Sequence, residues 1–500
     1  MQYWAKGGEP PRDLGTANRP REMPDAIRAA RLAALVPAVT LSAVTNAAAQ
    51  PALAAELRPF VSVDAPVVAL THARVIDGTG APPRADQTIV IEGGAIRAVG
   101  DAASVVVPAG ARTIDLAGRT VLPGLVMVHE HMFYPSGGGT VYNEQAFSFP
   151  RLYLAGGVTT ARTAGNMVGY ADLELKSAID EGRALGPALD VTAPYLEGPG
   201  LPIYQVHALT GPDDARQMVA HWADRGATSF KAYMHITRAE LKVAADEAHR
   251  RGLKITGHLC SVTFREAAAL GIDNLEHGVV VASDFAAGKT PDACPANQQA
   301  SVAAAPDDSI VALARDLATR KVALTSTLTV FETFAPNRPP APNGALDAML
   351  PEAREQYLRR RLAIASQPAS PWTMLLAKEM RFEREFLRAG GLLLAGTDPT
   401  GYGGVVAGYS NARELELLVE AGLTPLEAIT VGTLHGARYL GRADRVGSIA
   451  VGKRADLVVV RGDPSARIAD VENVETVFKD GVGYDSAKLF ASVKGQVGLH

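Results

Sequence analysis

The sequence predicts an α/β protein, built as a (β/α)₈ barrel of the TIM type with a small composite β-sandwich domain formed by both chain ends. Between residues 123 and 445, apolar strand candidates alternate with helical patterns, which is typical of βα units and a parallel sheet. Eight strand candidates occur there, the number that closes a barrel. Short β-type runs flank this region on both sides, and neither set is large enough for an independent sheet.

The length of the chain also favours more than one structural unit. Its 500 residues exceed the roughly 250–300 at which a single core stops growing. Apolar residues make up 47% and charged residues 20%, which is ordinary for a globular protein. We therefore predict a signal peptide and leader at 1–49, the N-terminal part of the β-sandwich domain at 66–122, the barrel at 123–445 with an insertion at 331–390, and the C-terminal part of the β-sandwich domain at 446–490.

The N-terminal segment has the layout of a secretory signal peptide. Arg28 and Arg31 precede an apolar stretch at 32–44, which ends in the small-residue run 47–49. We expect cleavage after Ala49 and a secreted or periplasmic protein; an alanine-rich disordered leader is the alternative. The apolar stretch is too short for a permanent transmembrane helix. No cysteine follows the cleavage point directly, so we expect no stable membrane anchor.

The β-type runs at the two chain ends are short and separated by turn residues. Glycines such as Gly78, Gly93 and Gly118 supply the turns in the first set. The strand candidates of the two ends are 68–70, 74–76, 88–91, 95–99 and 113–114, then 447–449, 456–460 and 474–478.

The strands and helices of the predicted barrel can be assigned individually. One helix is expected at 212–225, with Pro212 at its start, and another at 237–251, opened by a capping box of Thr237 and Glu240. The segment 331–390 interrupts the βα rhythm, since it is Pro-rich and then helical; we expect a lid or an oligomer contact there, and a homo-oligomer. The strand candidates are 125–131, 158–163, 189–193, 229–234, 254–259, 274–277, 323–328 and 392–397.

Composition excludes several classes of function. The net charge is −4, and the folded part has no dense Lys/Arg run, so we expect no nucleic-acid partner. Only Cys260 and Cys294 occur, too few for a disulfide framework or a thiolate metal cage, and Cys260 is expected in the core. Any metal must be held by nitrogen and oxygen.

Metal-competent side chains recur at the ends of the predicted barrel strands. His129 and His131 lie two apart on the first strand, so both point to one face. Because a barrel places its active site at the C-terminal rim, the whole set is expected to converge there. Its other members are Lys231 on strand four, His258 after strand five, His277 after strand six and Asp398 after strand eight.

Lys231 requires a separate argument, because an ammonium group would repel a dication. Either Lys231 pairs with a carboxylate and no metal binds, or its amine reacts with CO₂ to form an anionic carbamate. A carbamate has two oxygens and can bridge two cations. Four neutral imidazoles, two anions and a bridging hydroxide would then balance two divalent metals.

These motifs, taken in order, resemble the amidohydrolase superfamily, most closely its imidazolonepropionase-like and prolidase-like branch with a carboxylated lysine. The resemblance covers roughly 68 to 482. The family often has an aspartate where this chain has Met127. This position is not one of the expected metal ligands, so the difference concerns the residues that support the ligands and not the ligand set. The motifs are Leu122-Pro123-Gly124-Leu125 leading to His129-Glu130-His131, Phe230-Lys231-Ala232-Tyr233, Gly257-His258, Glu276-His277-Gly278, Gly396-Thr397-Asp398 and the tail 447–457.

The resemblance implies a ligand set and a mechanism. His129, His131 and Asp398 would hold one metal, His258 and His277 the second, and Lys231, as its carbamate, would bridge them. Zinc suits these ligands, although manganese, cobalt or iron could occupy them. A bridging hydroxide would attack a polarised carbonyl, with Asp398 passing the proton to the leaving amine.

Fewer residues can be assigned to the substrate. Tyr233 shares a strand face with Lys231, His207 lies in the loop after strand three, and Tyr402 lies in the loop after Asp398; each is a candidate for substrate binding. Glu130 is expected to face away from the site as a structural partner. The predicted function is hydrolysis of a peptide-like or N-acyl amide in a small molecule, with a cyclic amidase or lactonase as the alternative. Outside the enzymes, the alternative hypothesis is a metal-binding assembly protein without catalytic activity.

Overall fold

The computed structural model describes residues 52–136, 141–203, 205–367, 369–400 and 403–498. The predicted leader at 1–49 and Tyr402 lie outside the described residues. Among the described residues, the predicted barrel strands are all present, and they belong to two parallel sheets of order β11-β10-β7 and β12-β13-β14-β15-β16. Their bounds are β7 Leu125–Glu130, β10 Val158–Thr163, β11 Ala188–Asp190, β12 Ser229–Ala232, β13 Lys254–Gly257, β14 Asn274–Glu276, β15 Ala323–Ser326 and β16 Leu393–Ala395.

Two sets of contacts connect these parallel sheets. The isolated parallel bridges Thr192↔Ser229 and Leu196↔Ala232 link the chain after β11 to β12. At the other side, the amide of Thr397, just past β16, donates to the carbonyl of His129 on β7 at 3.1 Å. The fold is therefore mixed α/β, with its parallel strands connected in chain order.

The observed strands end earlier than predicted, because the chain leaves the sheet where the candidate site begins. His277 and Asp398 both have positive φ, at 71° and 51°. This left-handed conformation is uncommon for residues with a side chain and is costly to maintain. Burial continues through these positions, so the sequence pattern alone could not show where the sheet hydrogen bonds stop.

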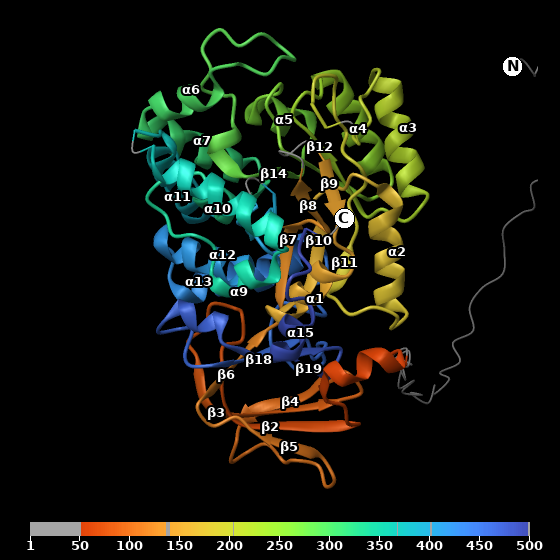
Figure 1. Ribbon diagram of the computed structural model, residues 1–500. Helices are drawn as coiled ribbons and strands as arrows, with labels where there is room; N and C mark the ends of the chain where they lie inside the picture. Colours follow the sequence, from red (N-terminus) through yellow and green to blue (C-terminus); the bar gives the residue numbers. More distant parts are fainter. Residues whose placement is uncertain (1–51, 137–140, 204, 368, 401–402, 499–500) are drawn as a thin grey trace, which may run out of the picture. The chain divides into compact units, whose positions relative to one another are not determined.

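Helices occupy the segments between the parallel strands (Figure 1). The predicted helix at 212–225 is α3, Pro212–Ala223, and that at 237–251 is α4, Arg238–Arg250, whose capping box of Thr237 and Glu240 is present. The other helices around the strands are α1 Ser148–Ala155, α2 Gly169–Asp180, α5 Phe264–Leu270, α6 Gln298–Ala304, α7 Asp307–Thr319, α12 Tyr409–Glu420, α13 Pro425–Thr430 and α14 Gly436–Tyr439, with η2 Gly278–Val281 and η3 Val431–His435.

The segment 331–390 is Pro-rich and then helical, as predicted. Its helices are α8 Leu328–Glu332, α9 Asn343–Ala348, α10 Pro351–Ala365 and α11 Trp372–Arg388. The C-terminal tail runs beside α9, where the amide of Gly495 donates to the carbonyl of Asp347 at 2.9 Å. Whether this insertion acts as a lid or an oligomer contact stays a prediction.

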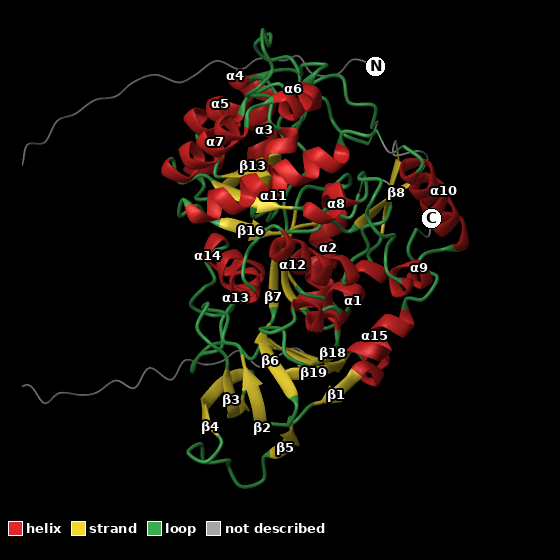
Figure 2. Ribbon diagram, turned by 90° about the vertical axis from the view of Figure 1, so that its left-hand side faces the viewer, coloured by secondary structure: helices red, strands yellow, loops and turns green. Residues whose placement is uncertain are grey.

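Strands from both chain ends share one nine-stranded sheet of order β1-β19-β18-β17-β6-β2-β3-β4, with β5 beside β2 (Figure 2). The two ends join in two antiparallel pairs, β1 with β19 and β6 with β17, the latter setting Val121 opposite Val459. The boundaries of the predicted domains stay a prediction. The strands are β1 Val61–Val63, β2 Val67–Val75, β3 Arg84–Glu92, β4 Ala95–Asp101, β5 Arg112–Asp115, β6 Arg119–Pro123, β17 Leu457–Arg461, β18 Val474–Lys479 and β19 Val482–Asp485; η1 Ala55–Phe60, η4 Ile468–Glu472 and α15 Ser486–Ser492 complete this part.

Cys260 is fully buried, as expected of a core residue, and it also forms a disulfide that was not predicted. Cys260 and Cys294 are joined with their Cα atoms 4.9 Å apart. This bond links the segment after β13 to the long loop after β14. The pairing was not predictable, because it depends on how that loop returns across the strand ends. Among the described residues, no helix combines the length and apolar character needed to cross a bilayer.

Three fully buried glutamates lie beneath β15, and they give the fold a pH dependence. Ser326 Oγ lies 2.7 Å from Glu383 Oε2 and 2.6 Å from Glu414 Oε1, and the amide of Val280 donates to Glu379 Oε2 at 2.7 Å. Burial, with the neighbouring carboxylate of Glu414, raises the pKa of Glu379 to about 8. Folding therefore keeps Glu379 protonated in conditions where the unfolded chain ionises it.

We expect Glu379→Gln to remove part of this pH dependence. Stability from a raised carboxyl pKa is complete below the unfolded pKa of 4.5 and is lost as pH rises towards the folded value of about 8. Relative to the parent, the free energy of unfolding of Glu379→Gln should rise between pH 5 and pH 8, by at most about 1.4 kcal/mol per pH unit. Denaturant unfolding at several pH values measures this, with exposed Glu352→Gln as control. A pH-independent difference would contradict the prediction.

Candidate metal centre

The six predicted ligands lie together at the C-terminal ends of the parallel strands. His131, Lys231, His258, His277 and Asp398 line one enclosed cavity of about 30 Å³. His129 lies beside it, with its ring centroid 4.6 Å from that of His277. Five separate strands therefore supply one cluster of nitrogen and oxygen ligands.

Asp398 is at the centre of this cluster. Its Oδ1 lies 3.1 Å from His131 Nε2 and 3.6 Å from His129 Nε2, and its Oδ2 lies 3.8 Å from His277 Nδ1. Potential ligand atoms of His129, His277 and Asp398 all lie within 4.8 Å of one another. His258 lies next to His277 in this cluster, and the centroids of the two rings are 4.4 Å apart.

Three of the imidazoles use Nδ1 for a contact outside the cavity. His129 Nδ1 lies 2.8 Å from Glu276 Oε2, His131 Nδ1 lies 3.0 Å from the carbonyl of Gly165, and His277 Nδ1 lies 2.8 Å from Thr327 Oγ1. Such contacts fix the ring and direct the other nitrogen towards a metal. His131 Nε2 and His277 Nε2 are buried without a hydrogen-bond partner. Their geometry fits a divalent metal, which would accept these lone pairs.

The electrostatic environment also suits ligation. Burial, with smaller effects of neighbouring charges, lowers the pKa of His131 to about 4 and of His258 to about 3, and lowers the pKa of His277 well below its usual value. Although burial opposes ionisation of Asp398, the adjacent His129 and His131 hold its pKa well below the usual range. The site therefore presents the neutral imidazoles of His131, His258 and His277 beside the carboxylate of Asp398 at neutral pH.

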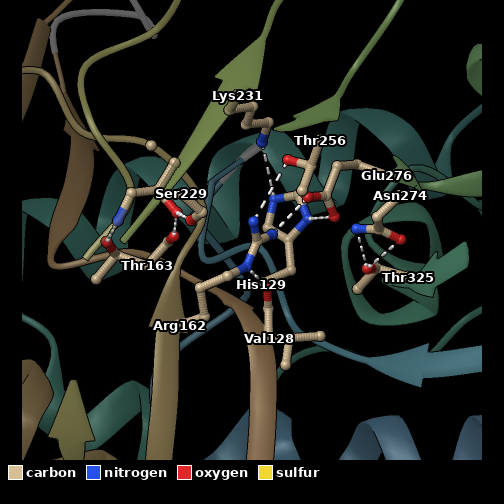
Figure 3. Close-up of polar contacts among 12 residues, drawn as sticks. Val128, His129, Arg162, Thr163, Ser229, Lys231, Thr256, Asn274, Glu276 and Thr325 are labelled. Carbon is tan, nitrogen blue, oxygen red and sulfur yellow. Dashed lines mark hydrogen bonds and ion pairs between the residues drawn. The ribbon is translucent and has the colours of Figure 1, made fainter. Parts of the chain in front are cut away.

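A buried ion pair supports His129, and sequence reasoning missed it. Arg162 on β10 donates to Glu276 Oε1 at 2.5 Å and to the carbonyl of Val128 at 2.7 Å (Figure 3). Burial disfavours the charge of Glu276, but Arg162 and His129 hold its pKa well below the usual value. An arginine within a fully buried strand of Val, Ala and Thr was a usable signal for this contact. Its partner could not be identified before the strand order was known.

We expect Glu276→Gln to weaken metal binding. The amide keeps the shape of the side chain but removes the charge that holds His129 Nδ1 and pairs with Arg162. Losing such a partner typically costs about 10–100-fold in metal affinity. Competition with a zinc chelator measures the change, and Glu383→Gln, which replaces an equally buried glutamate outside the site, is the control. Equal zinc affinities of Glu276→Gln and Glu383→Gln would argue against a role of Glu276 in supporting the metal site.

Glu130 holds the segment that carries Asp398. Its carboxyl accepts hydrogen bonds from Thr397 Oγ1 and from Asn411 Nδ2, the latter at 2.9 Å. Glu130 thus contacts the residue before Asp398 and lies outside the cavity lining, as a structural partner would. Burial, only partly offset by these hydrogen bonds, raises the pKa of Glu130 to about 8.

The predicted substrate residues have different positions. Tyr233 lines the cavity and stacks on Tyr195, with ring centroids 4.4 Å apart. His207 does not line it: its Nε2 lies 2.9 Å from Asp214 Oδ2, and its side chain is half exposed. Asp214 opens α3, so the charge at that helix start explains the position of His207. Tyr402 lies outside the described residues.

Further lining residues were not predicted, namely Phe133, Tyr142, Met167, Tyr195 and Thr400. Phe133 and Tyr142 belong to a hairpin of β8 Phe133–Ser136 and β9 Val141–Glu144. The Gly-rich connection between these strands was the available sequence signal. Tyr195 and Met167 lie in loops, where no periodicity reports on side-chain direction.

A family model described as "Amidohydrolase family" matches residues 120–483 of the chain. Among curated proteins, the chain is similar to an imidazolonepropionase of Parabacteroides distasonis, with 44% identity over 66 residues, or 12% of this chain and 16% of that protein. It is also similar to an enamidase of Eubacterium barkeri, with 40% identity over 79 residues, or 16% of this chain and 20% of that protein. These matches therefore span only a small part of those relatives.

Solved structures cover much more of the chain. A putative prolidase from Bifidobacterium longum has 25% identity and a TM-score of 0.61, covering 85% of this chain and 98% of that chain. A Xaa-Pro dipeptidase with bound methionine in the active site has 21% identity and a TM-score of 0.62, covering 84% and 100%. A bottromycin amidohydrolase has 21% identity and a TM-score of 0.65, covering 86% and 91%. The latter two show likeness of fold alone.

Proposed function

Because the chain belongs to the amidohydrolase family, on its imidazolonepropionase-like and prolidase-like branch, we propose that it is a binuclear metal-dependent hydrolase of a peptide-like or N-acyl amide C–N bond. The observation that carries this proposal is the convergence of four imidazoles, a lysine and a carboxylate. In this cluster His277 Nε2 is buried without a hydrogen-bond partner, and His131 Nε2 lies 3.1 Å from Asp398 Oδ1. A bound metal would satisfy those nitrogens.

The ligands divide into two sets around a shared lysine. His129, His131 and Asp398 would hold one ion, and His258 and His277 the other, with zinc as the expected metal. Two divalent ions held there would acidify a water molecule and polarise the scissile carbonyl. Burial keeps the imidazoles of His131, His258 and His277 neutral, and Glu276 orients that of His129, before any substrate enters.

Lys231 is proposed to be carboxylated. Its side chain is only 1% exposed, and its Nζ lies 3.1 Å from His129 Nε2, the nitrogen needed for ligation. An ammonium there would compete with a metal, whereas a carbamate adds ligand oxygens. In forming it, the amine attacks CO₂, one N–C bond forms and one proton is released. Burial lowers the pKa of Lys231 to about 8, although nearby Glu276 and Asp398 favour its charge.

Asp398 is proposed to move the proton. Its carboxylate lies within the ligand cluster, and the contact of Thr397 with Glu130 fixes the segment that carries it. An ionised carboxylate can accept a proton during attack on the carbonyl and deliver it to the departing nitrogen. Protonation matters because an amide nitrogen leaves poorly as an anion.

The scaffold of this site is proposed to be a closed (β/α)₈ barrel with a composite β-sandwich domain. The bridges after β11 and the contact of Thr397 with His129 support closure, and the sheet shared by β6 and β17 supports the composite domain. We also propose a secreted or periplasmic homo-oligomer. The disulfide of Cys260 and Cys294 supports export, since such bonds persist in oxidising compartments.

A metal and activity assay on the purified full chain tests the function. We expect two metal equivalents per chain, and hydrolysis within a panel of dipeptides, N-acyl amines, cyclic amides and lactones. Removing the metal should abolish turnover, and adding zinc should restore it. A folded, metal-loaded protein that cleaves nothing in the panel would instead support a non-catalytic metal-binding role. Turnover confined to lactams or lactones would support the cyclic amidase or lactonase alternative.

A further inference from the structure

One side of the cavity beside the metal centre is lined by apolar and aromatic side chains. Phe133, Tyr142, Met167, Tyr195 and Tyr233 all border it. With Ile203 they belong to an apolar cluster that is separate from the main core. The rings of Phe133 and Tyr142 lie 5.0 Å apart between centroids, and those of Tyr195 and Tyr233 stack. We call these five lining residues the aromatic wall; such a wall suits flat or apolar groups.

The tyrosines of the aromatic wall stay neutral. Burial, with a smaller effect of Asp398, raises the pKa of Tyr142 to about 12, and burial raises the pKa of Tyr195 and Tyr233 well above the usual value. Their hydroxyl groups can hydrogen-bond a carbonyl or amide of a substrate. They supply no positive charge to neutralise a carboxylate.

The loops at this end of the strands offer little positive charge. According to the sequence they contain only two Lys or Arg residues, Lys289 and Arg338. Lys289 contacts the backbone carbonyls of Ser261 and Thr290, and Arg338 pairs with glutamates, Glu420 among them. The loops are 131–147, 164–168, 191–211, 233–237, 258–263, 277–297, 327–342 and 396–408.

Two loop histidines outside the proposed ligand set are also engaged. His207 pairs with Asp214, and His235 pairs with buried Glu197. Among the described residues that line the cavity, the single Lys or Arg is Lys231, which the proposed metal site uses. A substrate carboxylate near the aromatic wall would therefore lose water without gaining a Lys or Arg partner, which is unfavourable.

Building on the proposed amide hydrolysis, we infer that the substrates are neutral amides with an aromatic or other apolar group beside the scissile bond. A carboxylate at that position, as in a dipeptide with a free C-terminus, is disfavoured. The inference narrows the substrate class within peptide-like and N-acyl amides. It rests on the composition of the aromatic wall and on the engagement of the nearby cations.

A matched substrate pair tests this inference. N-acetylphenethylamine and N-acetylphenylalanine differ by one carboxylate, and acetate release reports cleavage of the same bond in both. We expect kcat/KM to be at least about tenfold higher for the neutral compound, a difference of about 1.4 kcal/mol. Equal or faster cleavage of N-acetylphenylalanine would overturn the inference.

Two variants locate the preference in the aromatic wall. Tyr142→Arg introduces a cation there. It should lower the ratio of kcat/KM for N-acetylphenethylamine to kcat/KM for N-acetylphenylalanine by about tenfold, or reverse the preference. Arg360→Ala, on α10 outside the cavity lining, is the control and should leave the ratio unchanged. A ratio that Tyr142→Arg does not move, or that Arg360→Ala changes as strongly, would argue against the aromatic wall as the determinant.

A binding measurement separates this inference from the proposed function. Calorimetric titration of the metal-loaded protein with phenylalaninamide and with phenylalanine compares a neutral group with a carboxylate without requiring turnover. We expect tighter binding of phenylalaninamide. If neither acetylated compound is cleaved, the proposed function fails for this class, while the titration still decides the ligand preference. Tighter binding of phenylalanine would reject the preference.

Discussion

Replacing Asp398 by asparagine is expected to lower kcat by about 10²–10⁴-fold, the usual contribution of a positioned acid–base group. Asparagine keeps the size of the side chain but cannot accept and return a proton. Asp398 Oδ1 is 3.1 Å from His131 Nε2, so the change also removes an anionic ligand from the cluster. Steady-state kinetics at saturating zinc, with metal content measured on the same sample, separates these two effects.

The control for Asp398→Asn is Asp284→Asn. Asp284 is also buried, but its carboxylate accepts hydrogen bonds from the amides of Phe264 and Arg265 at the start of α5, outside the cavity lining. The Asp284→Asn variant should retain most of the parental activity. An Asp398→Asn enzyme that binds two metals and keeps parental kcat would reject the proton-transfer role, although the metal site would stand.

The strand order of the fold could be predicted because each barrel strand is a short apolar run bounded by turn residues and followed by a helix. All eight predicted strands occur within a few residues of the expected bounds. The errors lie at the C-terminal ends, where residues such as His277 leave the sheet with positive φ. Local pattern reports burial, and burial continues past the last sheet hydrogen bond.

The ligand cluster could be predicted for a related reason. His129, Lys231 and Asp398 are polar interruptions at the ends of apolar strands, and parallel topology brings such ends together. The contacts that support the cluster depend on three-dimensional neighbours instead. Arg162 meets Glu276 across 114 positions of the sequence. The disulfide of Cys260 and Cys294, and the position of Tyr142, likewise depend on how loops return over the strands.

The aromatic wall shows what sequence motifs leave open. Its members come from the β8–β9 hairpin, from two loops and from the segment after β12, and no periodic pattern relates them. His207 lies 2.9 Å from the carboxylate of Asp214, and its role in substrate binding stays a prediction. Side chains in long loops are positioned by such local partners. The residues that determine substrate specificity are therefore harder to predict from sequence than the metal ligands.

The second large effect is expected at Lys231. Lys231→Ala removes the proposed bridging ligand and should lower both metal occupancy and kcat/KM by more than the ~100-fold that loss of a supporting partner costs. The cavity it leaves lies beside Tyr195 and Tyr233, whose ring centroids are 5.4 Å and 5.6 Å from Nζ in the parent. Acetate or propionate should enter this space and partly restore activity, because a free carboxylate can replace the carbamate oxygens.

Restoration of activity by added carboxylates or bicarbonate distinguishes the carbamate form of Lys231 from the ammonium form. If the lysine is a carbamate, Lys231→Ala responds to short carboxylates, and reloading the metal-free parent with zinc requires bicarbonate. If it is an ammonium that pairs with Asp398 or Glu276, bicarbonate has no effect, and a neutral Lys231→Met variant loses the ion pair and part of its activity without responding to bicarbonate. Lys231→Arg is the control, since it preserves the positive charge, cannot be carboxylated and leaves no room for acetate. Parental zinc content and kcat in Lys231→Arg would therefore reject the carbamate and favour the ion pair.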